Sequence, residues 1–347
     1  MSKIKEIKTL LFIGPSPMAV GGVAVHIRRL SFLLDQLFQI RYIDEGKARN
    51  ADIFNIHSYN IFKYFNLVEG SDIVHIHSGS YILRILHIIV SKFILRKKTV
   101  ITIHHDVERE RLLSLSKYFI KKSDTLIVVN KNTYDVFDGV VKNLVLLPAF
   151  IPPIIENEPE LPSEVIRWID NCRKNKDAVI MISNAWNLVT HDGCDLYGLD
   201  LCLNAMKLLR DINEINYYLI FVVVSNTSNQ DLMCKYKQFV ENNNLQDNVL
   251  IWESELSFIR LIGESDIVLR TTNTDGDALT IREALFYEKT VIASDVVERP
   301  KNTLLFKNRD VNSLVDMILN TSVLSDKSCE FHDFDFYREK YLNIYNN

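Results

Sequence analysis

Two carboxylates, Asp275 and Glu283, stand eight residues apart around a glycine turn and the start of a predicted helix. The apolar run 266–269 before them is typical of a buried strand and 283–287 of a helix, so the segment should run strand, loop, helix. Backbone N–H groups at such a helix start can bind phosphate. Asp275 could accept a hydrogen bond from a sugar hydroxyl, and Glu283 from both hydroxyls of a ribose. The pattern therefore suits a sugar nucleotide, and a capped amphipathic helix with solvated acids is the simpler alternative.

This segment resembles the E-x7-E signature of the retaining glycosyltransferases of family 4, which have the GT-B fold, with Asp275 in place of the usual first glutamate. The strand and loop at 290–296 resemble the same family, and the likeness covers most of the chain. It implies that Asp275 lies against the transferred sugar and that Glu283 binds the nucleotide ribose. The donor diphosphate is then expected at the loop and helix start, formed by Gly276, Asp277, Ala278 and Leu279.

The basic residues that the family uses for the diphosphate are missing from the first loop of the second lobe. Asn184 and Tyr197 stand near the expected positions, and their hydrogen bonds would be weaker than charge-assisted ones. Arg270 and Arg282 are the local replacements, although Arg282 could instead lie on the solvated face of its helix. Two hypotheses follow: an enzyme with a rearranged phosphate clamp, or a noncatalytic partner subunit that binds nucleotide sugar or another transferase.

A glycine-rich turn at 14–26 follows the first predicted strand and opens the first helix. Its backbone amides could face a diphosphate. It does not match G-x-G-x-x-G, and the acids at 44–45 come too late for a dinucleotide ribose contact, so a nicotinamide oxidoreductase is a weaker alternative. In the resembling family paired glycines approach the donor phosphates and a histidine follows on the helix. That likeness places Gly21, Gly22 and His26 near the cleft, and a surface histidine is the other possibility.

Two histidine clusters, at 75–79 and 102–106, follow predicted strands, where ligands bind in doubly wound lobes. The family resemblance implies a histidine beside the transferring sugar after the fourth strand. His104 fits that position best, with His105 as the alternative, and His77 would line the acceptor side. A metal site is not expected, because only one aspartate accompanies the clusters and a satisfied histidine near a strand end is common.

Two D-x-D sequences, 275–277 and 333–335, have the spacing by which a different glycosyltransferase fold holds Mg²⁺ or Mn²⁺. The two-lobed pattern of the chain favours the GT-B architecture instead. That architecture stabilises the leaving diphosphate with backbone amides and cationic side chains rather than with a metal. We therefore expect no cofactor besides the nucleotide-sugar substrate.

Short apolar strands alternate with helical patterns along the whole chain, which is the rhythm of an α/β protein with two Rossmann-like, doubly wound lobes. Strands are expected at 9–13, 73–76, 99–103, 125–128 and 144–147, and again at 178–182, 217–224, 249–252, 266–269 and 290–293. The predicted domains are an N-terminal acceptor-binding domain (1–150), a proline-rich hinge (151–163), a C-terminal nucleotide-sugar-binding domain (164–327) and a last helix (328–347). That helix either crosses back to the first domain or packs on its own.

Composition places few limits on function: 347 residues with 47% hydrophobic and 24% charged content suffice for two ordinary soluble domains. The five cysteines form no CxxC pair, which fits reduced thiols. The apolar run at 10–13 is too short for a signal peptide, so a cytoplasmic protein is expected.

Charge divides unevenly, because residues 1–150 hold 21 Lys and Arg against 13 Asp and Glu, and the remainder holds 19 against 31. The segment 81–98 combines an apolar helix with a basic end. It could rest on anionic lipid at the inner membrane, or it could lie inside the first lobe with its basic residues capping the helix. A lipid-linked acceptor would explain why the acceptor lobe is the basic one.

These observations predict a retaining glycosyltransferase that moves a sugar from a nucleotide diphosphate to a hydroxyl of a glycan or polyprenyl-linked glycan. A role in bacterial surface polysaccharide synthesis is expected. No nucleic-acid partner is expected.

Overall fold

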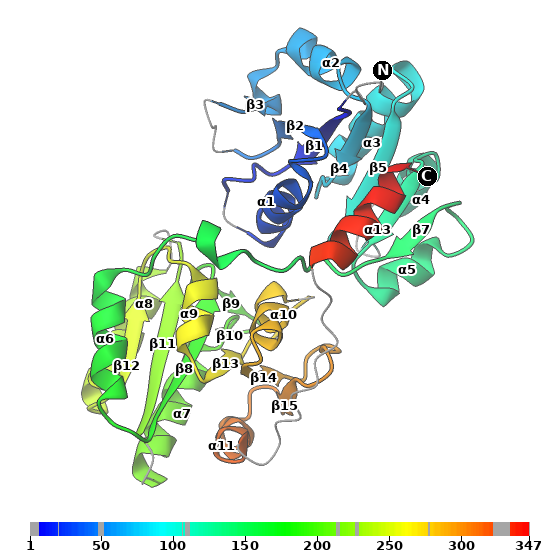
Figure 1. Ribbon diagram of the computed structural model, residues 1–347. Helices are drawn as coiled ribbons and strands as arrows, with labels where there is room; N and C mark the ends of the chain where they lie inside the picture. The colour runs from blue at the N-terminus through cyan, green and yellow to red at the C-terminus, as the bar shows by residue number, and fades with distance from the viewer. Residues whose placement is uncertain are drawn as a thin grey trace. The chain divides into compact units, whose positions relative to one another are not determined.

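The computed structural model describes residues 7–19, 21–47, 52–105, 107, 112–212, 216–225, 229–276, 278–321 and 334–346 (Figure 1). The chain forms two compact units, which are described separately. The N-terminal unit comprises Met1–Pro152 and His332–Asn347, and the C-terminal unit comprises Pro153–Phe331. The division falls within the proline-rich segment that was expected to link the two domains.

The N-terminal unit contains a seven-stranded parallel sheet with the order β3-β2-β1-β4-β5-β6-β7. The strands are β1 (Thr9–Gly14), β2 (Gln39–Asp44), β3 (Phe54–Asn55), β4 (Ile73–Ile76), β5 (Lys98–Ile103), β6 (Thr125–Val128) and β7 (Leu144–Leu146). The central strands are buried along their length, as in parallel sheets that helices cover on both faces. The order reverses between β1 and β4, and ligands bind at such a switch point in doubly wound folds.

The helices of this unit are α1 (Gly22–Leu34), η1 (Ile56–Ser58), α2 (Ile61–Glu69), α3 (Tyr81–Ile88), the π-helical turn η2 (Ile89–Ile94), α4 (Leu113–Ile120), α5 (Lys131–Phe137) and α13 (Phe334–Asn346). Several begin at a residue whose side chain accepts an N–H of the first turn, as Asn60, Ser80 and Asn130 do. These caps fix the points at which the chain leaves each strand-end loop.

The segment 81–98 does not form one helix with a basic end, as the sequence suggested. It is helical as far as η2, and its last residue, Lys98, already belongs to β5. The lysines there hold the carbonyl ends of other helices: Lys97 Nζ donates to the carbonyl of Glu69 in α2, and Lys98 Nζ to that of Tyr345 in α13. Both contacts neutralise the negative end of a helix dipole.

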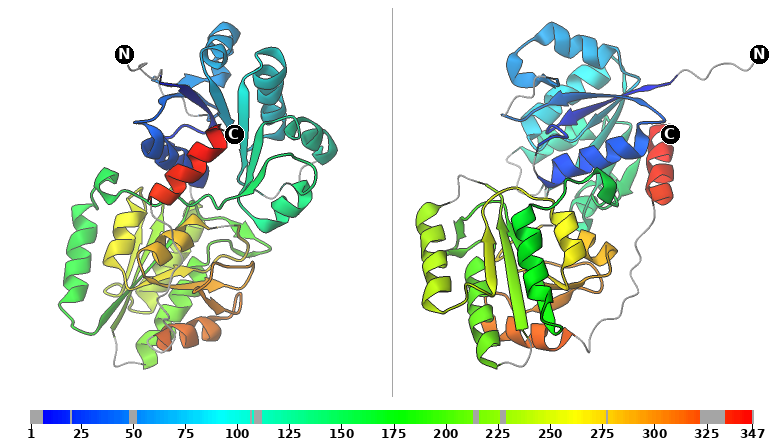
Figure 2. Two further views of the ribbon diagram at one scale, coloured as in Figure 1. Left: turned by 45° about the vertical axis from the view of Figure 1, so that its right-hand side comes forward. Right: turned by 60° about the vertical axis from the view of Figure 1, so that its left-hand side comes forward.

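The last helix, α13, packs on the N-terminal unit. Both views in Figure 2 show α13 (red) beside α1 (blue). Its buried face consists of Tyr337, Tyr341, Ile344 and Tyr345. The aromatic pattern that predicted an amphipathic helix therefore has its apolar partner in the first sheet's helical layer.

The C-terminal unit contains a six-stranded parallel sheet with the order β12-β11-β8-β13-β14-β15. The strands are β8 (Ala178–Ala185), β11 (Asn216–Val223), β12 (Val249–Trp252), β13 (Ile267–Arg270), β14 (Thr290–Ser294) and β15 (Leu304–Phe306), with a hairpin of β9 (Thr190–His191) and β10 (Cys194–Asp195). The helices are η4 (Ile155–Asn157), α6 (Ser163–Arg173), α7 (Leu199–Ile212), α8 (Gln230–Asn242), α9 (Phe258–Glu264), α10 (Leu279–Phe286) and α11 (Val311–Leu319). Separate apolar clusters cover the two faces of the sheet.

Among the described residues, no helix has both the length and the apolar character needed to cross a bilayer.

Candidate functional site

Asp275 lies in the loop between β13 and α10, where two arginines bind its carboxylate. Arg270, the last residue of β13, donates from Nε to Oδ2 and from Nη2 to Oδ1, both at 2.9 Å. Arg299 donates from Nη1 to Oδ2 at 2.7 Å, and Thr272 Oγ1 to the same oxygen at 3.1 Å. Such bidentate, charge-assisted contacts fix both the position and the plane of a carboxylate. Asp275 is therefore a rigid acid rather than a flexible loop side chain.

Arg299 was not identified from the sequence. It follows β14 and is buried, and it also donates to the carbonyl and the hydroxyl of Ser294 at 3.2 and 3.3 Å. Burial alone would raise the pKa of Asp275, but the hydrogen bonds and charges of Arg270 and then Arg299 outweigh it and lower the pKa to about 2. The carboxylate is ionised at every physiological pH.

The loops that follow β8 and β13 are joined by hydrogen bonds. Asn273 donates from its side chain to the carbonyl of His191 and from its backbone to that of Leu196. Thr271 Oγ1 donates to the carbonyl of Tyr197, and its backbone oxygen packs against Gly198. These contacts place Asp275 on a framework that both loops support.

The donor-site residues predicted on α10 lie at or after its start. Ala278 precedes the helix and offers no side-chain cap, and Leu279 is its first residue, so the first backbone N–H groups face the loop. Gly276 is exposed and Arg282 is half-buried. Glu283, the fifth helical residue, is 5% exposed, so it sits one turn into α10 rather than two. Asp277 lies outside the described residues.

Asn184 and Tyr197 stand near the positions at which the basic pair was expected. Asn184 is in β8, and among the described residues its buried Oδ1 accepts no hydrogen bond. The Tyr197 ring lies 5.8 Å from the guanidinium carbon of Arg270. Arg270 donates from Nε and Nη2 to Asp275, a pairing that the sequence did not predict for this proposed phosphate ligand.

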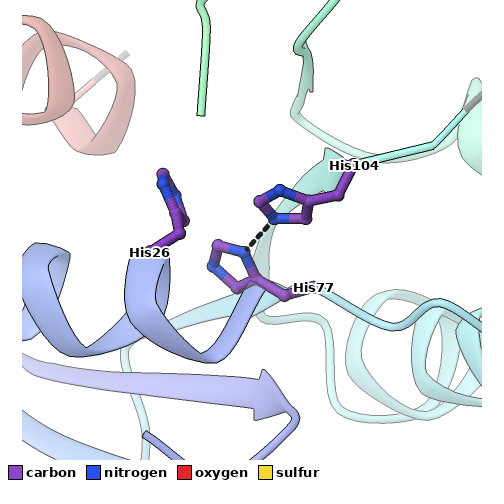
Figure 3. A group of neighbouring side chains, drawn as sticks. All are labelled: His26, His77 and His104. Carbon is purple, nitrogen blue, oxygen red and sulfur yellow. Dashed lines mark hydrogen bonds between the residues drawn. The ribbon is translucent and has the colours of Figure 1, made fainter. Parts of the chain in front are cut away.

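The N-terminal unit brings three predicted histidines together (Figure 3). His26 comes from the second turn of α1, His77 follows β4 and His104 follows β5. The ring centroids are 5.0 to 5.4 Å apart, and His77 Nδ1 is 3.0 Å from His104 Nε2. His26 and His77 are each 1% exposed, and His104 is half-buried. The carboxyl ends of β4 and β5 and the second turn of α1 thus form one histidine cluster, whereas the sequence patterns placed these histidines separately.

The contacts of His26 fix its tautomer. Its Nδ1 is 2.8 Å from the carbonyl of Ala149, which can only accept, so Nδ1 carries the proton. Its Nε2 lies 3.3 Å from the hydroxyl of Tyr341. Burial lowers the pKa of His26 to about 4 against the raising effect of the Ala149 hydrogen bond. Burial and the neighbouring imidazoles likewise lower the pKa values of His77 and His104, so the cluster is uncharged near neutral pH.

A fourth histidine, His75, lies behind the cluster. Its ring centroid is 4.0 Å from that of His77. Its Nδ1 is 2.7 Å from the hydroxyl of Tyr345, and its Nε2 is 2.7 Å from Thr102 Oγ1. Both ring nitrogens are therefore occupied, and His75 supports His77 rather than facing a ligand.

The glycine turn before α1 is open. Gly21 has a φ of 137° and precedes the helix without a side-chain cap, and both it and Gly22 are exposed. A Cβ at either position would meet no atom within 4 Å. His105 is half-buried, and its carbonyl accepts from Thr133 Oγ1 at 3.3 Å. It does not belong to the group formed by His26, His77 and His104.

No family model matches the chain. Over 130 residues it is 26% identical to the poly(ribitol-phosphate) alpha-N-acetylglucosaminyltransferase of Staphylococcus aureus. The match covers 32% of this chain and 26% of that protein, so the chain spans about a quarter of the length of this curated relative.

Solved structures match over nearly the full length. HepE of Anabaena, in complex with UDP-glucose, has a TM-score of 0.70 and 12% identity and covers 98% of this chain and 99% of its own. A glycosyltransferase of Rickettsia africae has a TM-score of 0.68 and 16% identity, covering 98% of both chains. A point mutant of S. aureus TarM, in complex with fondaparinux, alpha-GlcNAc-glycerol and UDP, has a TM-score of 0.64 and 13% identity, covering 98% and 100%. The predicted GT-B fold is confirmed.

Proposed function

From this GT-B fold, we propose that the protein is a retaining glycosyltransferase that moves a sugar from a nucleotide diphosphate to a hydroxyl of a glycan. The observation that carries the proposal is the arrangement of Asp275 and Glu283. A carboxylate fixed at the carboxyl end of β13 is followed by an uncapped helix start and then by a buried glutamate. In this proposal the carboxylate of Asp275 accepts from a sugar hydroxyl, the N–H groups of the helix start bind the diphosphate, and Glu283 accepts from the ribose hydroxyls.

The charge around Asp275 also suits a diphosphate. Arg270 and Arg299 carry two positive charges against the single negative charge of Asp275, so the group is net positive at the loop that precedes α10. The N-terminus of α10 adds the positive end of a helix dipole. This combination would stabilise a leaving diphosphate without the missing arginine and lysine pair, and without a metal on the diphosphate.

The donor is proposed to be a uridine diphosphate sugar. HepE and TarM, which share the fold, were solved with UDP-glucose and UDP respectively. In the transfer step the bond from the anomeric carbon to the phosphate oxygen breaks, and a bond to the acceptor oxygen forms on the same face. The acceptor proton passes to the leaving phosphate oxygen. Asp275 is the residue of the C-terminal unit proposed to contact the sugar, and His104 is that of the N-terminal unit; neither is required to form a covalent intermediate.

The acceptor is proposed to be a glycan, or a polyprenyl-linked glycan, of a bacterial surface polysaccharide. The curated relative acts on a poly(ribitol-phosphate), and TarM was solved with glycan ligands. The basic N-terminal half suits an anionic acceptor. Within that unit, His26, His77 and His105 are the proposed acceptor-side residues. The described cysteines are free thiols, which accords with a cytoplasmic location.

Peripheral contact with the inner membrane is part of the proposal. Exposed apolar side chains lie along α3 and η2, namely Ile82, Leu86, Phe93 and Ile94, and at the start of and along α4, namely Leu112, Leu115 and Tyr118. The two helices pack together, and Lys121 and Lys122 are exposed at the end of α4. Apolar side chains beside lysines are the composition that binds an anionic bilayer surface.

A noncatalytic partner subunit is the second candidate. It is favoured by one observation: both arginines nearest the donor loop are already bound to Asp275, and the family's usual basic pair is absent. Such a subunit would bind a nucleotide sugar, or another transferase, without turnover. Release of UDP from a UDP-sugar by the purified chain, dependent on an acceptor glycan, would exclude it.

Thermal unfolding with a panel of nucleotides tests the donor assignment. We expect UDP and UDP-sugars, but not GDP or ADP, to raise the melting temperature of the wild type. Glu283→Ala should abolish the shift because it removes the ribose acceptor. Glu241→Ala, an exposed glutamate on α8 of the same unit, is the matched control and should keep it. No shift with any nucleotide would contradict the proposed function.

A further inference from the structure

The histidine cluster of the N-terminal unit has the composition and spacing of a metal site. One nitrogen from each of His26, His77 and His104 lies within 4.8 Å of the others. Figure 3 shows the three rings side by side, each from a separate element, with His77 and His104 facing each other. We propose that these histidines bind one divalent late transition-metal ion, with Zn²⁺ as the best fit.

The ligand set selects the class of metal. Three imidazoles offer only nitrogen, whereas Mg²⁺ and Ca²⁺ require oxygen ligands. Zn²⁺ is commonly bound by three protein ligands with a fourth position open to water. His104 is half-buried, so solvent can reach that position. The described cysteines all lie in the C-terminal unit, so no thiolate competes for this role in the described part of the chain.

The surroundings of His26 match the usual second shell of a metal-binding histidine. Such a histidine donates its other ring N–H to a carbonyl or carboxylate, which fixes the ring and leaves one lone pair for the metal. His26 does this through Nδ1 and the Ala149 carbonyl, which leaves Nε2 as the metal-binding nitrogen. That nitrogen accepts a hydrogen bond from the Tyr341 hydroxyl at 3.3 Å, which a metal would displace.

His77 supplies an independent observation. It is 1% exposed, and its Nε2 has no hydrogen-bond partner among the described residues. A buried ring nitrogen without a partner is costly, and such groups often mark a ligand site. A metal bound at Nε2 would satisfy this nitrogen, whereas Nδ1 already has the His104 contact.

The rearrangement that binding requires is small. Tetrahedral Zn²⁺ with nitrogen ligands at about 2.0–2.1 Å places them about 3.3 Å apart. Nitrogens now within 4.8 Å of one another would each move by about 1 Å or less, through rotation of the side chains.

Occupancy would also affect His104 as a residue of the transfer reaction. A His104 imidazole bound to a metal could not also contact the transferred sugar, so we expect Zn²⁺ to slow turnover. This consequence rests on the proposed function, whereas the metal site itself does not.

The test is direct titration of the metal-free full chain with Zn²⁺, followed by calorimetry, with Co²⁺ absorption as a report on tetrahedral nitrogen coordination. We expect one equivalent to bind. His104→Ala should weaken binding by more than the roughly 10- to 100-fold that follows loss of a second-shell partner. His191→Ala, an exposed histidine of the C-terminal unit, is the matched control and should leave binding unchanged.

Several results would overturn the site. These are no Zn²⁺ binding by the wild type, unchanged binding by both His104→Ala and His77→Gln, or equal binding of Mg²⁺. Because His77 is buried, a melting curve is recorded for each variant to check folding. If His77→Gln does not fold, Zn²⁺ binding by the variant of half-buried His104 is the deciding measurement. Binding that leaves turnover unchanged would retain the site and contradict only the role of His104 in transfer.

Discussion

Arg299 Nη1 lies 2.7 Å from Asp275 Oδ2, although the two residues are 24 positions apart and lie in loops that follow different strands. Both side chains are buried, at 2% and 8% exposed. The pair therefore links the loop after β14 to the loop after β13. It makes the geometry of Asp275 depend on an arginine that no local motif identifies.

Removing Arg299 should loosen the donor loop. Arg299→Ala leaves Asp275 with Arg270 and Thr272, and loss of a hydrogen bond between charged groups costs about 1.5–3 kcal/mol. We expect a similar drop in the free energy of unfolding of the C-terminal unit. The protein's three tryptophans, Trp168, Trp186 and Trp252, all lie in that unit, so their fluorescence during urea unfolding reports it selectively.

The control for this experiment is Lys237→Ala, which breaks an exposed ion pair with Glu253 in the same unit. Exposed pairs contribute less than about 1 kcal/mol. Equal losses of unfolding free energy in the two variants would show that the buried position of Arg299 does not strengthen its ion pair.

The low pKa of Asp275 predicts a pH dependence of stability. The folded-state pKa of about 2 lies below the ordinary aspartate value of 3.8, so the ionised carboxylate stabilises the fold above pH 3.8. That contribution, about 2 kcal/mol, is lost as the pH falls through 2. We expect Asp275→Asn to be less stable than the wild type at pH 6, with the difference shrinking towards pH 3. A difference independent of pH would indicate that the substitution acts through packing rather than charge.

The strands that the sequence predicted correctly have a continuous apolar run. Most of them are buried along their length, whereas β7 and β12 are half-buried or exposed over most of theirs. β2 was missed for the same physical reason. Its first four residues, 39–42, are exposed or half-buried, and its sequence Gln-Ile-Arg-Tyr has no such run. The short edge strands β3 and β15 also have too few residues to leave a pattern.

The candidate site was predictable only where one stretch of chain carries it. The 275–283 segment and the histidines at strand ends could be identified because parallel strands deliver their carboxyl ends to one edge. The pairing of Arg299 with Asp275 depends on two loops meeting in space. The grouping of His26 with His77 and His104 joins positions 51 and 27 residues apart, which matches no local metal motif. The roles assigned to these residues in transfer remain predictions.

Two glycines allow the contact between the loops after β8 and β13 to be tested separately from backbone strain. Gly198 and Gly193 have the same φ of 76°, so alanine is strained at both positions. A Cβ at Gly198 would also lie 2.3 Å from the carbonyl oxygen of Thr271, whereas a Cβ at Gly193 meets nothing within 4 Å. Gly193→Ala should cost about 1 kcal/mol and Gly198→Ala at least about 2 kcal/mol. Tryptophan fluorescence during urea unfolding measures the loss of stability in each variant. Equal losses would mean that the two loops can move apart without destabilising the unit.

The exposed apolar face of α3 and η2 predicts membrane binding that one charge should disrupt. Ile94 is 55% exposed, and its replacement by aspartate places a negative charge against an anionic bilayer while leaving the core of the unit intact. We expect the wild type to sediment with vesicles containing phosphatidylglycerol, and Ile94→Asp to do so several-fold less. Raised salt should weaken the lysine contribution. Ile212→Asp tests whether any exposed isoleucine would behave this way, because Ile212 is 60% exposed but lies in the C-terminal unit. Loss of vesicle binding in both variants would show that any exposed isoleucine has this effect, and would contradict a membrane-facing role for α3 and η2. An absence of vesicle binding by the wild type would contradict it as well.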